Sequence, residues 1–469
     1  MTPSGNGIMR MLKFMGVVLA LGAVAVVPGR SAILDDGLPN ADDGGPTLVD
    51  QGPNVDDPNL PVDPTDPGAG PGVVGPADDG LQCTRSRNGG ATDVGVTASS
   101  IKLASTMVKT GPGASFLADS PTAMQAVVNK VNAAGGICGR LLQLTLRDDK
   151  WDANLGLGFL KAFIQEGVFA LPVVPSSEGL TAAIEAGEID KAKIPVVGTD
   201  GMLKQQYQSP WVFPVATATI STMRTMAKFG YDKGARCFGI VYDTRFRFGR
   251  EGAEAYRNYV KTLKGAKVCS DVGIFPERAS YSSEIQQFNS QCDGKCEFVA
   301  WLLEPGTALT WVAGRPQKGT MYTSGAQTLF NQNFAANCGG DCAGMLVWTG
   351  YNPPIGNMAG LPDVARYVED VRTIDPKVDT TNQFMEGAYL GMTVFVEALR
   401  QVGPNLTRER LRQVLNSQTF RSDIASTLRW SEKDRFANKW AQAFSIVVAQ
   451  GSFAGFRNER TGFIKDPAL

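Results

Sequence analysis

The chain has 469 residues, of which 43% are hydrophobic and 19% charged, a composition typical of a soluble globular protein with an ample core. The length predicts about two to three domains. No histidine is present, which excludes a Ser-His-Asp triad, a Cys-His pair, an imidazole base and His-ligated zinc. The composition therefore argues against most classes of enzyme.

The first residues have the pattern of an export signal. Arg10 and Lys13 precede an apolar run over residues 14–27, and the small residues Ser31 and Ala32 follow it. We expect residues 1–32 to be a signal peptide that is cleaved. The alternative is an uncleaved membrane anchor, although the run is shorter than a span of about 20 residues. Both alternatives place the chain outside the cytoplasm, in the periplasm, at the cell surface or secreted.

Residues 33–82 contain eleven aspartates, many prolines and glycines, and no lysine or arginine. Such a segment cannot bury enough apolar surface to order itself, so we expect a disordered, extended linker. Without this linker and the three cations of the signal, the formal net charge changes from −1 for the whole chain to +7. These charges are scattered without a basic run, so nucleic-acid binding is not expected.

All eight cysteines follow residue 82, and an even number in an exported chain indicates disulfides. Two of the expected pairs are close in sequence and lie within glycine-containing loops. A third pair flanks two successive strand-like runs, and the two cysteines that are left form the fourth pair. The expected pairs are Cys292/Cys296, Cys338/Cys342, Cys237/Cys269 and Cys83/Cys138. Sequence alone does not determine this connectivity. No CxxC spacing occurs, so no metal site is expected.

The remainder of the chain begins with alternating strand and helix patterns. Strands are expected at residues 100–108 and 141–146, and helices at residues 121–132 and 154–165. The first helix ends before the paired glycines Gly135-Gly136, a typical helix stop.

Two polar turns follow neighbouring buried strands. The apolar run 169–174 is followed by Pro175-Ser176-Ser177 and a helix from Glu178, and the run 194–197 is followed by Gly198-Thr199-Asp200. Open α/β sheets bind ligands at the carboxyl ends of their strands, where both turns are expected to lie. The first turn offers free N–H groups and hydroxyls at a helix N-terminus, which suit an anionic or carbonyl oxygen. The alternative is that the two serines only cap the helix.

A second series of strands and helices follows. Strands are expected at 237–242, 267–275, 298–303, 320–323, 343–349 and 443–449, and helices at 252–263, 282–290, from 308, at 362–373 and at 382–402. Alternating strands and helices predict parallel sheets.

Five short segments occur in a recognisable order. They are NAAGGICGR (132–140), VVPSSEG (173–179), IPVVGTDG (194–201), WVFPVATAT (211–219) and GMLVWTGYNPP (344–354). Together they resemble the periplasmic binding proteins of the branched-chain amino-acid (Leu/Ile/Val) receptor class. The resemblance extends over about residues 92–457 and is most specific in its first third.

The resemblance implies an α/β fold of two Rossmann-like lobes with parallel sheets, joined by three crossovers and holding a ligand between them, the type I periplasmic-binding-protein (Venus-flytrap) fold. We expect lobe 1 to comprise residues 83–215 and 352–428. Lobe 2 would comprise residues 216–351 and 429–460, and residues 461–469 would form a C-terminal tail.

The resemblance also implies a set of ligand contacts in the first lobe. Ser176 and Ser177 match the serine-rich turn that holds the ligand carboxylate in this family, and Gly198 and Thr199 match the neighbouring turn. Tyr351 lies at a crossover, where it is either a hinge residue or part of the cleft wall.

Further candidates carry alternatives of their own. Asp200 is either a ligand contact or a solvated turn residue or helix cap. Phe248 matches a cleft aromatic from the second lobe, or packs in the core, and Phe116 is a similar candidate from the first lobe. Glu304 and Ser324 follow second-lobe strands; the Ser324 position is typically acidic in amino-acid binders. The serine departs from that pattern unless Asp200 or Glu304 supplies the charge.

The sequence thus predicts an extracytoplasmic substrate-binding protein of an ABC-type importer. Its expected partners are a small polar ligand, amino-acid-like or an amide, and a membrane permease, and the chain is expected to be monomeric without a cofactor. A sensor that presents its closed form to a signalling partner is one alternative. A hydrolase using two carboxylates is another, although no GxSxG or Walker motif is present and no GxGxxG opens a helix after a strand.

Overall fold

The computed structural model describes residues 83–469, apart from the side chain of Cys292. These residues belong to one compact unit. The expected signal peptide and linker lie outside the described residues. None of the helices within 83–469 has the length and apolar character needed to cross a membrane.

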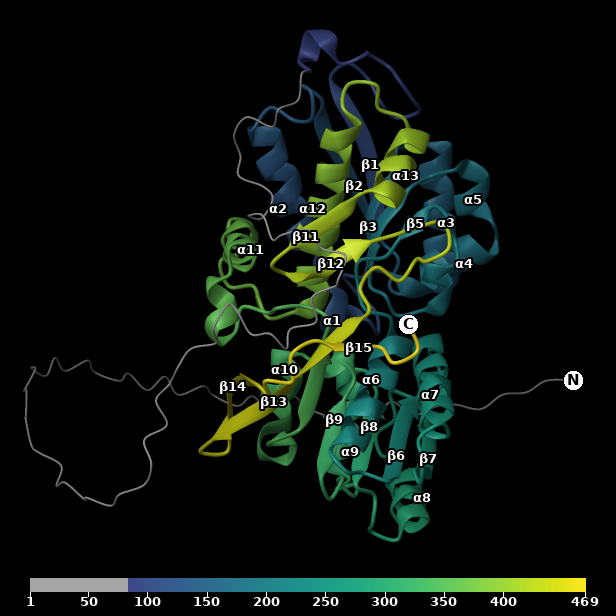
Figure 1. Cartoon of the computed structure of the whole chain (residues 1–469), viewed down its shortest axis with the longest axis vertical. Coiled ribbons are helices and arrows are strands. Elements are labelled where there is room, and N and C mark those ends of the chain that lie inside the picture. Colours follow the sequence, from purple (N-terminus) through teal and green to yellow (C-terminus); the bar gives the residue numbers. More distant parts are fainter. Residues whose placement is uncertain (1–82) are drawn as a thin grey trace, which may run out of the picture. The chain divides into compact units, whose positions relative to one another are not determined.

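Thirteen α-helices and fifteen strands make up the described part of the chain (Figure 1). The helices are α1 (Ala114–Leu117), α2 (Ser120–Ala133), α3 (Ala153–Gln165), α4 (Ser177–Glu185), α5 (Glu188–Ala192), α6 (Thr219–Asp232), α7 (Arg247–Val260), α8 (Ser282–Cys292), α9 (Pro305–Ala313), α10 (Gln332–Cys338), α11 (Pro362–Arg372), α12 (Gln383–Val402) and α13 (Arg408–Ser417). The strands are β1 (Ser100–Met107), β2 (Leu141–Asp148), β3 (Leu171–Val174), β4 (Val196–Thr199), β5 (Val212–Phe213), β6 (Cys237–Asp243), β7 (Lys267–Ile274), β8 (Phe298–Leu302), β9 (Tyr322–Gly325), β10 (Leu346–Thr349), β11 (Thr419–Ser422), β12 (Ala425–Arg429), β13 (Trp440–Ala449), β14 (Ser452–Asn458) and β15 (Ile464–Lys465).

The first lobe contains a parallel array in the order β2-β1-β3-β4-β5. β1 pairs with β2, β3 pairs with β4 and β4 with β5, and a parallel bridge between Leu103 and Ala170 joins the two groups. Every residue of β3 and β4 is buried because helices cover both faces of the sheet. Helices α2 and α12 pack on one face, and α3 and α4 contribute to a separate apolar cluster on the other.

The second lobe contains a larger sheet in the order β14-β13-β10-β9-β8-β6-β7. Strands β6 to β10 pair in parallel, as the alternating pattern predicted. β13 instead runs antiparallel to β10, β14 and β15. The chain enters β13 from the β11–β12 hairpin rather than from a covering helix, so the pattern that predicts a parallel strand is absent there.

The chain passes three times between the lobes, as the resemblance implied. It leaves the first sheet after β5, returns after β10 to enter α11 and α12, and leaves again after β12 to enter β13 (Figure 1). The mixed α/β fold with parallel sheets is therefore confirmed, whereas the exact lobe boundaries stay a prediction. The segment expected to be a tail contains β15, and its buried Asp466 forms an ion pair with Arg224 of α6.

The structure joins Cys83 to Cys138, Cys237 to Cys269 and Cys338 to Cys342. Cys296 is disulfide-bonded as well, and no free cysteine occurs among the residues that the structure describes. The sulfur atoms of Cys237, Cys269 and Cys296 lie within 4.8 Å of one another. Because metals bind thiolates, these oxidised sulfur atoms do not make a metal site.

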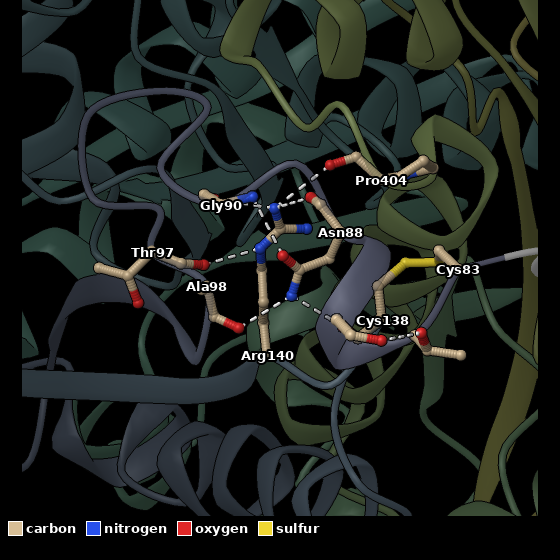
Figure 2. The surroundings of a disulfide bond; sticks show 10 residues. Cys83, Asn88, Gly90, Thr97, Ala98, Cys138, Arg140 and Pro404 are labelled. Carbon is tan, nitrogen blue, oxygen red and sulfur yellow. Dashed lines mark hydrogen bonds between the residues drawn. A yellow bond between two sulfur atoms is a disulfide. The ribbon is translucent and has the colours of Figure 1, made fainter.

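The end of the NAAGGICGR segment forms a buried polar junction, which Figure 2 shows beside the Cys83–Cys138 disulfide. The fully buried Arg140 donates from Nε to the carbonyl oxygen of Thr97 at 2.8 Å. Its Nη2 donates to the carbonyl oxygens of Gly90 at 3.0 Å, of Pro404 at 3.2 Å and of Asn88. One guanidinium thus ties the start of the described chain to β2 and to the loop after α12, and its burial lowers the pKa of Arg140.

Replacing Arg140 with Met should lower the free energy of unfolding by about 3 kcal/mol, because the change leaves several buried carbonyl groups without a donor. Urea denaturation measures the effect. The matched control is Lys295→Met, whose side chain is 79% exposed and which should change stability by less than about 0.5 kcal/mol. Equal stability of both variants would contradict the structural role of Arg140.

Candidate functional site

A small cavity lies where the strand ends of the first lobe meet the crossovers and the second lobe. Its wall includes Thr199 at the end of β4, Asp200 directly after it, Thr217 and Tyr351 on two crossovers, and Gln327 after β9. Gln383, Phe384 and Gly387 at the start of α12 also line it. About 20 Å³ is open to the centre of a water molecule, so the described conformation is closed around little more than a water-sized space.

Asp200 organises the turn on the first-lobe side of the cavity. Its carboxylate accepts hydrogen bonds from the backbone N–H of Ser177 at 3.0 Å and of Met202 at 3.1 Å. It also accepts one from Nε2 of Gln206 at 2.8 Å. Burial raises the pKa of Asp200 to about 6 although these donors favour the charged form. Asp200 is therefore not a solvated turn residue; it is a buried acid at the cavity wall that also satisfies an N–H group at the start of α4.

Thr199 fixes the same turn from the other side. Its hydroxyl donates to Oε1 of Gln206 at 2.9 Å and accepts from the backbone N–H of Gly201 at 3.1 Å. Gln206, on the short 3₁₀ helix Lys204–Tyr207, therefore links Thr199 and Asp200. The hydroxyl and the carboxylate are held rigidly at the end of β4.

Ser176 and Ser177 lie at the start of α4, as expected, and both are fully buried. Ser176 is the N-cap residue, but its side chain makes no capping hydrogen bond. Its buried hydroxyl makes no hydrogen bond within residues 83–469, although it opposes the effect of burial, which raises the pKa of Asp149 to about 6. Ser177 accepts a hydrogen bond at 3.0 Å from Nε1 of Trp151. Neither serine lines the cavity in the described conformation.

Five aromatic residues, Phe116, Trp151, Phe246, Phe248 and Phe384, form an aromatic wall. Trp151 bonds to Ser177 of the serine turn, and Phe384 lines the cavity. The Trp151 ring lies 4.3 Å from that of Phe246 and 5.9 Å from that of Phe248, both at the start of α7 in the second lobe. On its other side, Phe116 lies 5.4 Å from Trp151 and 5.2 Å from Phe384. All five side chains are buried, and their packing joins residues from the two lobes.

Three predicted site residues have internal roles instead. Glu304 caps α9, where its carboxylate accepts from the N–H of Gly306 at 2.8 Å and of Thr307. Ser324 is fully buried and accepts from Nε1 of Trp348 at 2.8 Å. A Cβ on Gly198 would lie 3.1 Å from Cα of Gly391, so this glycine allows α12 to approach β4. None of the three lines the cavity; ligand contact by them stays a prediction.

Sequence reasoning missed several residues of the site. Trp151 follows the carboxyl end of β2, and Phe246 lies in the same loop as Phe248. The positions of both residues in the sequence therefore indicated that they could lie near the site. Gln327 follows the carboxyl end of β9 and so had the same positional indication, whereas Gln383 and Phe384 had none, because only the packing of α12 against the first sheet brings them to the cavity. The side-chain oxygen of Gln327 is buried and has no donor within residues 83–469, while its amide donates to Thr219 at 2.8 Å.

Two α/β lobes with a polar cavity at their strand ends define a two-lobed binding protein of the type I periplasmic-binding-protein fold. A family model described as periplasmic binding protein matches residues 100–451, and the chain belongs to this family. No curated protein sequence matches the chain significantly.

Solved structures share the fold at low sequence identity. A fatty acid ABC transporter substrate-binding protein from Thermomonospora curvata has a TM-score of 0.66 and 19% identity, over 83% of this chain and 95% of that one. An ABC transporter substrate-binding protein from Sphaerobacter thermophilus has a TM-score of 0.66 and 15% identity, over 78% and 98%. A branched-chain amino acid transporter substrate-binding protein from Streptococcus pneumoniae, in complex with isoleucine, has a TM-score of 0.64 and 14% identity, over 78% and 99%.

The buried Asp200 should make stability depend on pH. Its pKa of about 6 in the folded protein lies above the ordinary value of 3.8. The folded protein therefore binds more protons than the unfolded chain between about pH 4 and 6, and the free energy of unfolding falls as the pH rises through this window. Relative to the wild type, Asp200→Asn should gain about 2 kcal/mol of stability between pH 4 and pH 7.

Urea titrations at pH 4, 5, 6 and 7 measure this difference. Asp293→Asn, at a side chain that is 90% exposed, is the control for replacing a carboxylate with an amide. A stability difference between Asp200→Asn and the wild type that stays constant over this range would show that Asp200 keeps its charge on burial.

Proposed function

We propose that this protein is the extracytoplasmic substrate-binding component of an ABC-type importer. It captures a small polar solute between its lobes and delivers it, as a monomer, to a membrane permease. Membership of the periplasmic binding protein family and the export pattern of residues 1–32 support this role. The observation that carries the proposal is the cavity itself, where Asp200, Tyr351 and Gln327 come together from the first lobe, a crossover and the second lobe.

The polar groups of the cavity favour a solute that donates hydrogen bonds. The wall contains the carboxylate of Asp200 and the free oxygen of Gln327, and no lysine or arginine lines it among the described residues. The Ser177 N–H at the start of α4, where the resemblance implied a ligand carboxylate, is already bonded to Asp200. An internal carboxylate therefore occupies the helix N-terminus. The favoured ligand class is a neutral or cationic polar solute, such as an amide or an amine, rather than an anion.

Binding requires the lobes to separate and close again, because the cavity is too small in the described conformation to admit such a solute. The three crossovers provide the hinge. A ligand that makes contacts only when both lobes surround it binds the closed form better and shifts the population toward it. The permease would recognise this closed form.

Polar contacts of α7 with α4 and with the 3₁₀ helix Lys204–Tyr207 accompany closure. Arg247 at the start of α7 forms an ion pair with Glu185 of α4 at 2.7 Å, and its N–H donates to Glu178 at 3.4 Å. Glu251 accepts from the N–H of Lys204 at 3.1 Å and from the amide of Gln205 at 3.2 Å. These contacts exist only while the lobes are together, so they stabilise the closed form.

A thermal-shift screen over amino acids, amino-acid amides, polyamines, sugars and aromatic acids tests the proposed function. Amides or amines should raise the melting temperature, because a ligand selective for the folded state stabilises it. Ser177→Ala and Thr199→Ala should each lower the affinity for the best ligand about fivefold, by loss of a hydrogen bond worth about 1 kcal/mol that orders the strand-end turns.

Calorimetric titration measures the affinities, and circular dichroism verifies that both variants fold. Ser452→Ala, at an exposed position of β14, is the control and should bind like the wild type. Unchanged affinity in both Ser177→Ala and Thr199→Ala would count against a site at these turns. A preference for anionic solutes would reject the assigned ligand class.

Reversing the charge of Arg247 should weaken ligand binding from outside the cavity. Arg247→Glu places like charges against Glu185 and Glu178 and should lower the affinity several-fold, because a partly exposed pair contributes at most about 1 kcal/mol. The double variant Arg247→Glu with Glu185→Arg should recover part of the loss. Arg457→Glu, whose partner Glu459 is two residues away in the second lobe, is the control. Equal affinity of all these variants would show that the contacts between α4 and α7 do not contribute to closure.

A further inference from the structure

A second and larger depression lies in the first lobe, away from the cavity between the lobes. It is bounded by α2, α11, α12 and the β11–β12 hairpin, and about 120 Å³ of it is open to the centre of a water molecule, six times the value for the cavity. We call it the α12 groove. No residue lines both the α12 groove and the cavity. The α12 groove and the cavity are therefore separate sites.

The floor of the α12 groove is apolar. It is formed by Val127 and Val131 of α2, Leu390 and Val394 of α12, and Phe420 and Ile424 of the hairpin. All six side chains are buried beneath the groove, whereas Gln401 and Thr419 at its edge are exposed. From Tyr389 to Arg400, the part of α12 that lines the groove rises about 16 Å. A slender hydrocarbon chain or an aromatic group fits such a channel.

Two of the cations at the groove already have acidic partners. Lys130 forms an ion pair with Asp370 at 2.8 Å, and the hydroxyl of Tyr389 donates to the same carboxylate at 2.7 Å. Arg366 pairs with Asp363 at 2.8 Å. These two pairs leave no net charge where Lys130 and Arg366 line the groove.

Arg400, in the last turn of α12, is different. Within residues 83–469 it makes no ion pair or hydrogen bond, and its Nε atom is buried without an acceptor. Glu397, one turn earlier, accepts a hydrogen bond from Gln401 at 2.9 Å rather than from Arg400. A buried guanidinium nitrogen without an acceptor is costly, and a carboxylate satisfies it with two parallel hydrogen bonds.

We propose that the α12 groove is a second ligand site, which binds an amphipathic organic carboxylate. The carboxylate pairs with Arg400, and the hydrocarbon part lies along the apolar floor between α2 and the hairpin. The charge of this ligand is opposite to that favoured in the cavity between the lobes. The two sites therefore select different solutes, and this inference stands whether or not the proposed ligand of the cavity is correct.

Octanoate is the probe for this site, with octan-1-ol and octylammonium as analogues of equal chain length. Calorimetric titration of the full chain should show octanoate binding at least tenfold more tightly than either analogue. Arg400→Gln should lower the affinity for octanoate at least tenfold and weaken its dependence on salt. Thr393→Trp, which fills the groove with an indole ring, should abolish binding.

Two controls locate the bound octanoate. Arg372→Gln, an exposed cation of α11 outside the groove, should bind octanoate like the wild type. Thr199→Ala, in the cavity between the lobes, should do the same. Unaltered binding by Arg400→Gln and Thr393→Trp, or loss of binding in Thr199→Ala, would overturn the assignment to the α12 groove. Equal affinity for octanoate and octan-1-ol would overturn the role of Arg400.

Discussion

The site depends on the burial of one carboxylate, that of Asp200, between the end of β4 and the start of α4. Free N–H groups at a helix N-terminus and a carboxylate in a buried place are each costly alone, and each removes the cost of the other. Asp200 meets the Ser177 N–H at 3.0 Å and the Gln206 amide at 2.8 Å. This arrangement holds two strand-end turns in fixed positions and leaves an acidic group at the cavity wall. On this acidic group rests the proposal that the cavity accepts a neutral or cationic solute.

Around this polar centre the two lobes meet through aromatic side chains. Trp151 of the first lobe packs 4.3 Å from Phe246 of the second, and Phe384 of α12 connects this wall to the cavity. The burial of aromatic surface favours closure and depends little on direction. The polar groups, in contrast, require a ligand whose hydrogen-bonding groups match them. Excluding water also strengthens each hydrogen bond made inside. Closure and selectivity thus rest on different sets of side chains.

Helix α12 contributes residues to both the cavity and the α12 groove. Its first turns present Gln383, Phe384 and Gly387 to the cavity, and its last turns present Val394 and Arg400 to the α12 groove. The middle of α12 packs closely against β4, because Gly391 of the helix contacts Gly198 of the strand. A single helix therefore lines both the cavity and the α12 groove, for which we propose ligands of different charge.

Much of the architecture could be read from the sequence, because apolar periodicity is a local property. The strands at 100–107 and 141–148, the helix α12 and the two polar turns after β3 and β4 all lie where the pattern predicted them. The antiparallel β13 was not predicted, because its direction depends on the β11–β12 hairpin that precedes it. Likewise, Glu304 and Ser324 stand at strand ends as expected, yet their side chains bond internally to α9 and to Trp348.

The sequence by itself determined the family, the alternation of strands and helices, and the two turns that carry Ser177, Thr199 and Asp200. Only the tertiary structure decided which side chains face one another. Gln327, Tyr351 and Gln383 become neighbours because distant elements pack at one place, and Asp200 turns to the α4 N-terminus because a buried carboxylate needs donors there. Local patterns set the elements, whereas the partners of a polar side chain follow from packing between segments far apart in the chain.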